Sequence, residues 1–430
     1  FVKYKHFKQA LLFKVGSYLI VCIWVIKEYA KRELGVFQAP FIFTLASSLM
    51  MTPQFCTIIY NPYYDCDLLY DLSFIMITGT ISFYRGVEKS SLKHIQSCYD
   101  IQLEKSTWMF VLMFIIGLLL TSKADSVASN FRIEDGGDIR GNHTFQILLF
   151  FRRYFDYGYF FALVYYSRKK QISKKLLIIL IIGSLYYLQA VLFFARRALT
   201  VKLFMSLALL LSMTKPKWRK KIKWGGITFF SIGMIYNASI GDIRSNLSDK
   251  SSAVDIDYWE NYKQSFYSPN MIHGMDLGNG ALFIKYTKEH MNYNFGLFLW
   301  DDIVTWYFPS FIFGKEGKEN LKVANANDRY IESVTHGVTT STGYYDAFSA
   351  FSYFGFILFY FMGYILGYIW NRAKVSSLYL ILYLNLMYNI PNLASHGFSY
   401  IIGNIETFIV FAIPLLWNFM YKKKCLINKK

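Results

Sequence analysis

The chain has 430 residues, of which 54% are hydrophobic and only 17% are charged. A water-soluble fold of this length cannot bury that much apolar surface, so the composition excludes an ordinary soluble globular protein and predicts a membrane protein. The net charge of +18 does not indicate a nucleic-acid-binding protein, because the Lys and Arg residues lie in short segments between apolar runs.

Apolar runs follow one another along the chain and predict an all-α, single-domain protein with about eleven transmembrane helices. No cleavable signal peptide is expected at the start, because Lys14 interrupts the first apolar stretch. The expected spans are residues 9–27, 36–60, 67–85, 107–122, 145–167, 175–195, 198–213, 223–240, 346–370, 376–394 and 399–421.

Basic segments predict the orientation of these spans. They are residues 168–175, 214–223, 371–374 and 421–424. The positive-inside rule assigns them to the cytoplasmic side of the membrane, and counting back from the tail places all four on that side. Residues 241–345 then form one large outer loop. By the same count the basic start, FVKYKHFK, lies outside, which the rule does not favour.

Two stretches of the large loop, 281–291 and 297–308, have apolar residues at helical spacing. We expect short amphipathic helices that either lie on the membrane surface or cap the bundle. Cysteines occur at five scattered positions without metal-type or redox-type spacing, so no disulfide, metal or cofactor is expected.

Three charged residues, Arg152, Arg153 and Asp156, lie inside an expected span, FQILLFFRRYFDYGYFFALVYY. Charges at such a depth cost a few kcal/mol each unless they are paired or face a wet cavity. Spacings of three and four residues allow Asp156 to pair with one arginine within the helix. The alternative is an anion-binding role in a groove.

Arginines also occur where helices are expected to end near the outer surface, at Arg196, Arg197 and Arg244. Three guanidinium groups at neighbouring helix ends favour a clamp for a pyrophosphate, because the planar fork binds phosphate oxygens bidentately. Taken singly, Arg196 or Arg197 could instead contact lipid headgroups.

Candidates for acid and base chemistry follow in the second half of the chain. His336 lies in a Ser/Thr/Gly-rich stretch near Arg329 and is either an acid/base or hydrogen-bond donor at a leaving phosphate, or a solvated loop histidine. Asp346 is either a base or a favourable charge at a helix N-terminus. Glu406 is a lone carboxylate in an apolar run, which indicates a polar cavity.

Three stretches surround the large loop in a distinctive order. The first is ARRALTVKLFMSLALLLSMTKPKWRKKIKW, followed by a helix that ends at GDIRSN, and the second is FGLFLWDDIVTWYFPSFIFGKEGKEN. The third is GVTTSTGYYDAFSAFSYFGFILFYFMGYILGYIW, with a Phe-Gly pair at Phe354 and Gly355 and later glycines at Gly363 and Gly367. In this order, over residues 190–370, they resemble the Wzy-type oligosaccharide repeat unit polymerases of O-antigen and capsule assembly.

The resemblance implies a GT-C-like lipid-linked sugar transferase architecture and an inverting, metal-independent transfer of a glycan from undecaprenyl pyrophosphate to another lipid-linked repeat unit. It implies as partners the undecaprenyl-pyrophosphate-linked oligosaccharides, membrane lipid and a chain-length regulator protein, but no nucleic acid. Arg197, Arg244 and His336 match family positions. Many relatives carry a glutamate where Ser349 stands, so the base is left open, with Asp346 as the nearest acid.

Physical reasoning agrees with a pyrophosphate leaving group, whose developing charge needs cations placed in advance. Arg196, Arg197 and Arg244 would supply them, with Arg152, Arg153 and Arg329 contributing from other walls. An O-antigen ligase would use the same fold and similar arginines. A flippase or transporter also carries embedded charges, but repeated halves are absent from the sequence and a single large outer loop is present.

Overall fold

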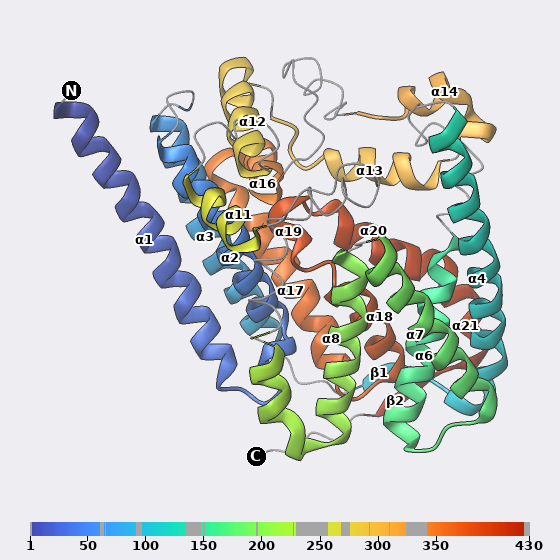
Figure 1. Cartoon of the computed structure of the whole chain (residues 1–430). Coiled ribbons are helices and arrows are strands. Elements are labelled where there is room, and N and C mark those ends of the chain that lie inside the picture. Colours follow the sequence, from blue (N-terminus) through green and yellow to red (C-terminus); the bar gives the residue numbers. More distant parts are fainter. Residues whose placement is uncertain are drawn as a thin grey trace.

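A computed structural model describes most of the chain as an all-α bundle with two short strands (Figure 1). The described residues are 2–60, 64, 66–91, 97–134, 148, 151–194, 197–226, 228, 257–267, 276–291, 293–308, 310–323 and 342–424.

The elements of the bundle are as follows. In the first half they are α1 (Val2–Ala30), α2 (Ala39–Tyr60), α3 (Cys66–Ser91), β1 (Ser97–Ile101), α4 (Leu103–Glu134), α6 (Arg153–Lys169), α7 (Lys174–Phe194) and α8 (Arg197–Thr214). In the second half they are α11 (Tyr258–Tyr267), α12 (Asp276–His290), α13 (Phe298–Tyr307), α14 (Ser310–Asn320), α16 (Gly343–Phe351), α17 (Phe356–Ala373), α18 (Ser377–Met387), α19 (Asn392–Ser395), α20 (Ser399–Thr407), α21 (Ile413–Leu416) and β2 (Met420–Lys424).

Within the described residues, five helical stretches are long and apolar enough to cross a membrane, which makes the chain a multi-pass membrane protein. They are Ala10–Ala30, Ala39–Ile59, Leu103–Ala124, Gly343–Ala373 and Ser399–Phe419. All five coincide with expected spans. Lys202–Thr214 and Ser377–Met387 are apolar but shorter, and the expected span 223–240 lies largely outside the described residues. The total of eleven therefore stays a prediction.

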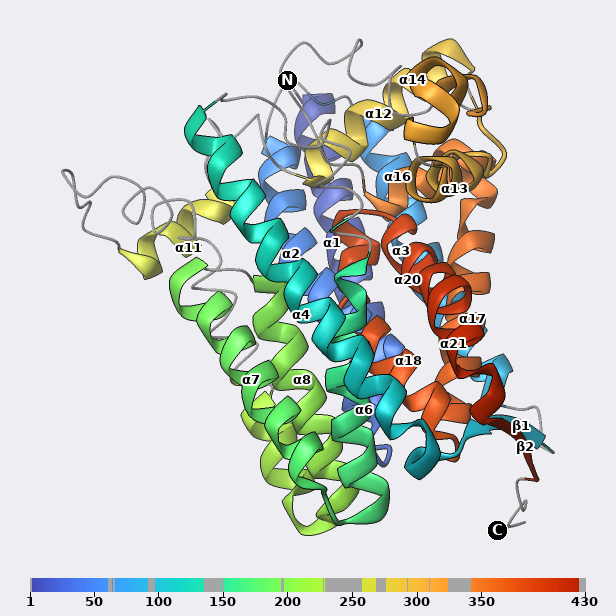
Figure 2. The same ribbon diagram turned by 90° about the vertical axis from the view of Figure 1, so that its right-hand side faces the viewer.

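The basic segments between helices gather at one end of the bundle (Figures 1 and 2). One end carries the turn between α6 and α7, the end of α8, the turn between α17 and α18, and the strand β2, which together hold the four basic segments. The opposite end carries α12, α13 and α14, and α1 begins there. The start of α1 and the strand β2 therefore lie at opposite ends of the bundle, as expected of a chain that crosses the membrane an odd number of times.

Glycines allow α3 and α17 to pack closely. A Cβ atom at Gly363 of α17 would lie 2.2 Å from the carbonyl oxygen of Phe83, and one at Gly86 of α3 would lie 2.1 Å from that of Tyr360. Such distances leave no room for a side chain, so the two backbones touch. Small residues in this pattern are a common way to join helices in membranes, where water exclusion drives little association.

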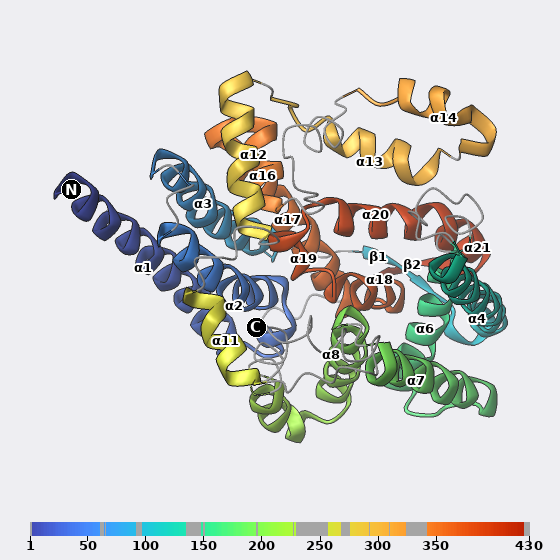
Figure 3. The ribbon, with the colours of Figure 1, turned by 45° about the horizontal axis from the view of Figure 1, so that its top comes forward.

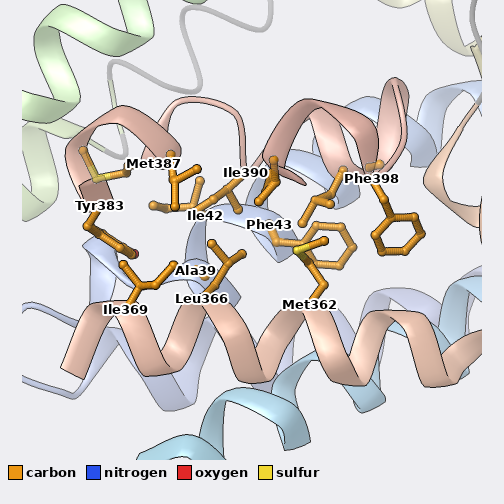
Figure 4. Packing of buried hydrophobic residues seen from close by; sticks show 14 of the residues in the cluster. Ala39, Ile42, Phe43, Met362, Leu366, Ile369, Tyr383, Met387, Ile390 and Phe398 are labelled. Atoms are coloured by element: carbon orange, nitrogen blue, oxygen red, sulfur yellow. The ribbon is translucent and has the colours of Figure 1, made fainter. Parts of the chain in front are cut away.

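Apolar side chains of α2, α17 and α18 interlock in the centre of the bundle (Figure 4). The residues labelled there are Ala39, Ile42, Phe43, Met362, Leu366, Ile369, Tyr383, Met387, Ile390 and Phe398. The Tyr383 hydroxyl donates to the Phe37 carbonyl oxygen at 2.6 Å, which satisfies a buried polar group that would otherwise cost stability.

Two of the expected spans are broken rather than straight. The run 346–370 is interrupted after α16, where Ser352 adopts a φ of 52°, and α17 continues from Phe356. The run 399–421 contains a π-helical turn, Phe408–Ala412, between α20 and α21. Hydropathy records neither break, because the residues on both sides are equally apolar. α16 packs against α12, and α20 packs against α13 (Figure 3).

Strands β1 and β2 pair antiparallel at the basic end, with Asp100 opposite Tyr421 and Ser97 opposite Lys424. The Ser376 hydroxyl donates to the Tyr99 carbonyl oxygen at 2.8 Å, so this small sheet is fastened to the start of α18. The pairing joins the beginning of α4 to the end of the described chain.

Candidate functional site

An ion pair lies buried between α6 and α8. The Lys202 ammonium contacts the Asp156 carboxylate, and the Tyr187 hydroxyl of α7 donates to the same carboxylate. The Lys202 side chain is only 2% exposed, and its charge lies 4.3 Å from the ring centre of Tyr388 at the end of α18. Carboxylate, hydroxyl and aromatic face together offset the cost of burying an ammonium group.

Both arginines of the same region reach to neighbouring helices. Arg153 donates to the Gly403 carbonyl oxygen of α20 at 2.8 Å and to the Thr407 hydroxyl. Arg152 donates to the Tyr186 hydroxyl at 3.1 Å. The ion pair within the helix that spacing allowed is replaced by a pair between helices, because Lys202 is more deeply buried and needs the Asp156 carboxylate.

Lys202 is a residue that the sequence reasoning missed. It lies five positions after Arg197 in ARRALTVKLF, and a lone charge in an apolar run is the same signal that identified Asp156. Both α6 and α8 begin inside the bundle and run toward the basic segments (Figures 1 and 2). Arg153 and Lys202, near the starts of these helices, therefore lie farther from the basic segments than Arg168 and Lys169 at the end of α6.

The other predicted phosphate ligands are only partly described. Arg197 is the first residue of α8, and nothing further is described of its side chain. Arg196, Arg244, Arg329 and His336 lie outside the described residues. The predicted clamp and the predicted loop histidine therefore stay predictions.

Asp346 is buried in the first turns of α16, whose N-cap is Thr342. Its Oδ2 accepts a hydrogen bond from the Phe398 amide at 3.2 Å. Gly397 has a φ of 89°, and a Cβ atom there would lie 2.0 Å from the same carboxylate oxygen. Asp346 therefore holds the turn that leads into α20, a role beyond the two that the sequence suggested.

Ser349 occupies a tightly packed place near Asp346. Its hydroxyl accepts from the Asn294 side chain at 3.0 Å, and its carbonyl oxygen accepts from the Asn294 amide at 2.9 Å. The residue is buried, so the longer glutamate of the family pattern would not fit without rearrangement.

Comparisons with protein-family models, with characterised proteins and with solved structures find no match to this chain.

The stretches 281–291 and 297–308 form helices, α12 and α13, as expected. α12 buries Leu277, Ala281 and Ile284 against the bundle, which agrees with a capping role. α13 lies beside α14, and the Trp300 indole donates to the Leu321 carbonyl oxygen at 2.9 Å (Figure 3).

Asp302 connects α13 to the bundle, because its carboxylate accepts a hydrogen bond from the Ser399 hydroxyl at the start of α20. Burial raises the pKa of Asp302 to about 6, with Asp301 and Glu406 acting in the same direction and the bond from Ser399 opposing them. A carboxylate with this pKa can exchange protons near neutral pH. In the sequence, the feature that could have indicated this carboxylate is the acidic pair Asp301 and Asp302 in an otherwise apolar run.

A second polar cluster lies at the same end. The Asp71 carboxylate at the start of α3 accepts from the Tyr353 hydroxyl at 2.7 Å and pairs with Lys288 of α12. The Asp71 carboxylate raises the pKa of the Lys288 ammonium. This cluster holds α12 over α3 and the break before α17, and no motif indicated it.

Proposed function

We propose that this chain is an oligosaccharide polymerase of the Wzy type, an inverting, metal-independent glycosyltransferase with a GT-C-like architecture in the bacterial plasma membrane. The observation that carries the proposal is the set of cations on α6 and α8 inside an apolar bundle. Arg152, Arg153 and Lys202 lie there, and Arg197 begins α8. A polyprenyl pyrophosphate needs such surroundings, because its chain is apolar and its head is anionic.

The gathering of the four basic segments at one end of the bundle supports the orientation. The positive-inside rule puts the four basic segments in the cytoplasm, so the end with α12, α13 and α14 faces the periplasm. The starts of α6 and α8 then face the periplasmic leaflet, where lipid-linked repeat units are joined.

In the proposed reaction, a sugar hydroxyl of one lipid-linked repeat unit attacks the anomeric carbon of the glycan on undecaprenyl pyrophosphate. The bond between that carbon and the pyrophosphate oxygen breaks, and the configuration at the carbon inverts. The leaving pyrophosphate keeps the electron pair, and Arg196, Arg197 and Arg244 stabilise its charge, with Arg329 contributing. The hydroxyl proton passes to a base, for which His336 and Asp346 are the two candidates.

The buried ion pair has a positioning role in this proposal. Lys202 and Asp156 join α8 to α6, and Arg197 and Arg153 lie toward the periplasmic ends of these two helices. A fixed spacing between the two helices keeps the cations at a constant separation, and charge stabilisation depends strongly on such preorganisation.

The test is polymer ladder formation by purified protein with authentic undecaprenyl-pyrophosphate-linked repeat units in detergent. We expect the parent to elongate them and Arg197→Ala, Arg244→Ala and His336→Ala to lose at least 100-fold in rate while eluting as folded protein. The matched control is Lys217→Ala, an exposed cation at the basic end, which we expect to keep the parental rate.

Failure of the parent to elongate authentic substrate contradicts the polymerase proposal. Transfer of finished polymer to a lipid core acceptor would then identify an O-antigen ligase. Movement of lipid-linked units across vesicles without any new glycosidic bond would identify a flippase. A chain-length regulator is a partner of the polymerase only, so its effect on ladder length separates the first case from the other two.

A further inference from the structure

A cavity of about 410 Å³ opens at the basic end of the bundle, where β1, β2, the start of α4, the end of α6 and the start of α18 meet. Four cationic side chains line it, Lys105, Arg168, Lys169 and Lys423, together with two carboxylates, Asp100 and Glu104. The cavity is separate from the buried ion pair between α6 and α8.

The carboxylates do not use up the positive charge. Asp100 is buried, accepts from the Ser377 amide at 2.8 Å and pairs with Lys423 at 3.3 Å. Glu104 pairs with Lys169 at 2.7 Å on the exposed side of the cavity. Four cations against two carboxylates leave two positive charges in excess, and Lys105 and Arg168 carry them.

Arg168 has neutral hydrogen-bond partners. Its two terminal nitrogens donate to the carbonyl oxygens of Ala373 at 2.8 Å and Lys374 at 3.1 Å. Its Nε is buried and has no acceptor within the part of the chain that the structure describes. The Asp100 carboxylate acts on this guanidinium but also pairs with Lys423, so the positive charge is only partly compensated and the cavity suits an added anion.

The surroundings of the cavity are those of a membrane interface. Trp108 of α4 is 58% exposed and packs edge-on against Phe419, with ring centres 6.2 Å apart, and Trp417 is 70% exposed. Exposed tryptophans gather at the depth of lipid headgroups. Leu112, Ile115 and Leu119 continue the exposed face of α4 away from the cavity at helical spacing.

We propose that this cavity binds the phosphodiester headgroup of an anionic phospholipid. The phosphate lies among Lys105, Arg168 and Lys169, and the acyl chains follow the exposed apolar face of α4. A free phosphate ion would use the cations but would gain nothing from the aromatic and apolar surface beside them. Anionic lipids are attracted to basic segments at the cytoplasmic surface, which agrees with the charge at this end.

The test is native mass spectrometry of the purified full chain with dioleoylphosphatidylglycerol and, separately, with dioleoylphosphatidylcholine. We expect the first lipid to bind at least tenfold more tightly, and K105Q/K169Q to remove that preference. The matched control is K217Q/K220Q, which removes the same charge from two exposed lysines at the same end but outside the cavity. This control keeps the preference.

Equal binding of the two lipids, or equal loss in both double variants, would overturn the proposal, because general surface charge would then explain the attraction. A third arm adds inorganic phosphate at millimolar concentration. Bound phosphatidylglycerol that stays in place supports a lipid site, whereas displacement by phosphate contradicts it and identifies a site for the free ion. Lys105 and Lys169 are exposed, so their replacement leaves the fold intact, which gel filtration checks.

Discussion

Lys202 of α8 and Asp156 of α6 form an ion pair inside an apolar bundle, where the lysine is almost completely shielded from solvent. We expect Lys202→Ala to lower the free energy of unfolding by about 3–5 kcal/mol, because the Asp156 carboxylate is left buried without its counterion. The measurement is thermal or denaturant unfolding of the detergent-solubilised protein.

The double variant Lys202→Met/Asp156→Leu serves as the control for this prediction. Replacing a buried pair by apolar residues of similar size often costs little, so most of the lost stability should return. A double variant as unstable as Lys202→Ala would mean that the lysine stabilises the bundle through packing rather than through charge.

Replacement of Gly363 by alanine should push α17 away from α3. The added methyl would lie 2.2 Å from the Phe83 carbonyl oxygen, a backbone atom that cannot give way locally. We expect a loss of about 1–3 kcal/mol or more, measured as a lower melting temperature. Gly16→Ala in α1 has open space at its Cβ position and should leave stability unchanged, so an equal loss there would contradict this packing argument.

Removal of the Asp302 carboxyl should make stability less dependent on pH. The pKa of this group is about 6 in the folded protein and 3.8 normally, so ionisation destabilises the fold. This cost is absent below about pH 4 and complete above about pH 6, where it reaches about 3 kcal/mol at most. Asp302→Asn should therefore match the parent near pH 4 and be more stable at pH 7.5.

The same unfolding measurements on Glu316→Gln provide the control for Asp302, since Glu316 is an exposed acid of α14. We expect that variant to follow the parent at both pH values. An Asp302→Asn curve parallel to the parental one would mean that Asp302 titrates normally.

Asp346 can be tested for structural and catalytic roles separately. An asparagine keeps the oxygen that accepts from the Phe398 amide, whereas alanine leaves that amide without its partner. We expect Asp346→Ala to lose about 1–3 kcal/mol of stability and Asp346→Asn to keep both stability and polymer ladder formation within about threefold. A stable Asp346→Asn protein that forms no ladder would instead make Asp346 the base.

Apolar runs predict the long spans well, because each span must satisfy its own backbone hydrogen bonds in lipid and must therefore be a helix. They predict neither the break at Ser352 nor the π-helical turn before α21, since both occur within continuous apolar sequence. The sequence shows that Arg153 is a charge within an apolar run, but it does not show that the partner of this arginine is on α20. Partners depend on which helices are neighbours, and spacing along one helix does not contain that information.

Other residues also differ in whether the sequence indicates their role. Gly363 and Gly367 stood out as a pattern, and the structure gives them a packing role against α3. Lys202 did not stand out, although a buried charge in a membrane span is expensive enough to require a partner. The hydrogen bond from Ser399 to Asp302 joins a residue of the large loop to one 97 positions later in the chain, so no local pattern predicts it.

The pairing of β1 with β2 has a consequence for biosynthesis. Lys423 and Asp100, which this pairing brings together, are 323 positions apart in the chain. During translation β1 must therefore wait until α18 and β2 have been made before it can pair. The basic end of the bundle closes only after these late segments are in place, so the lipid-binding cavity is absent from shorter nascent chains.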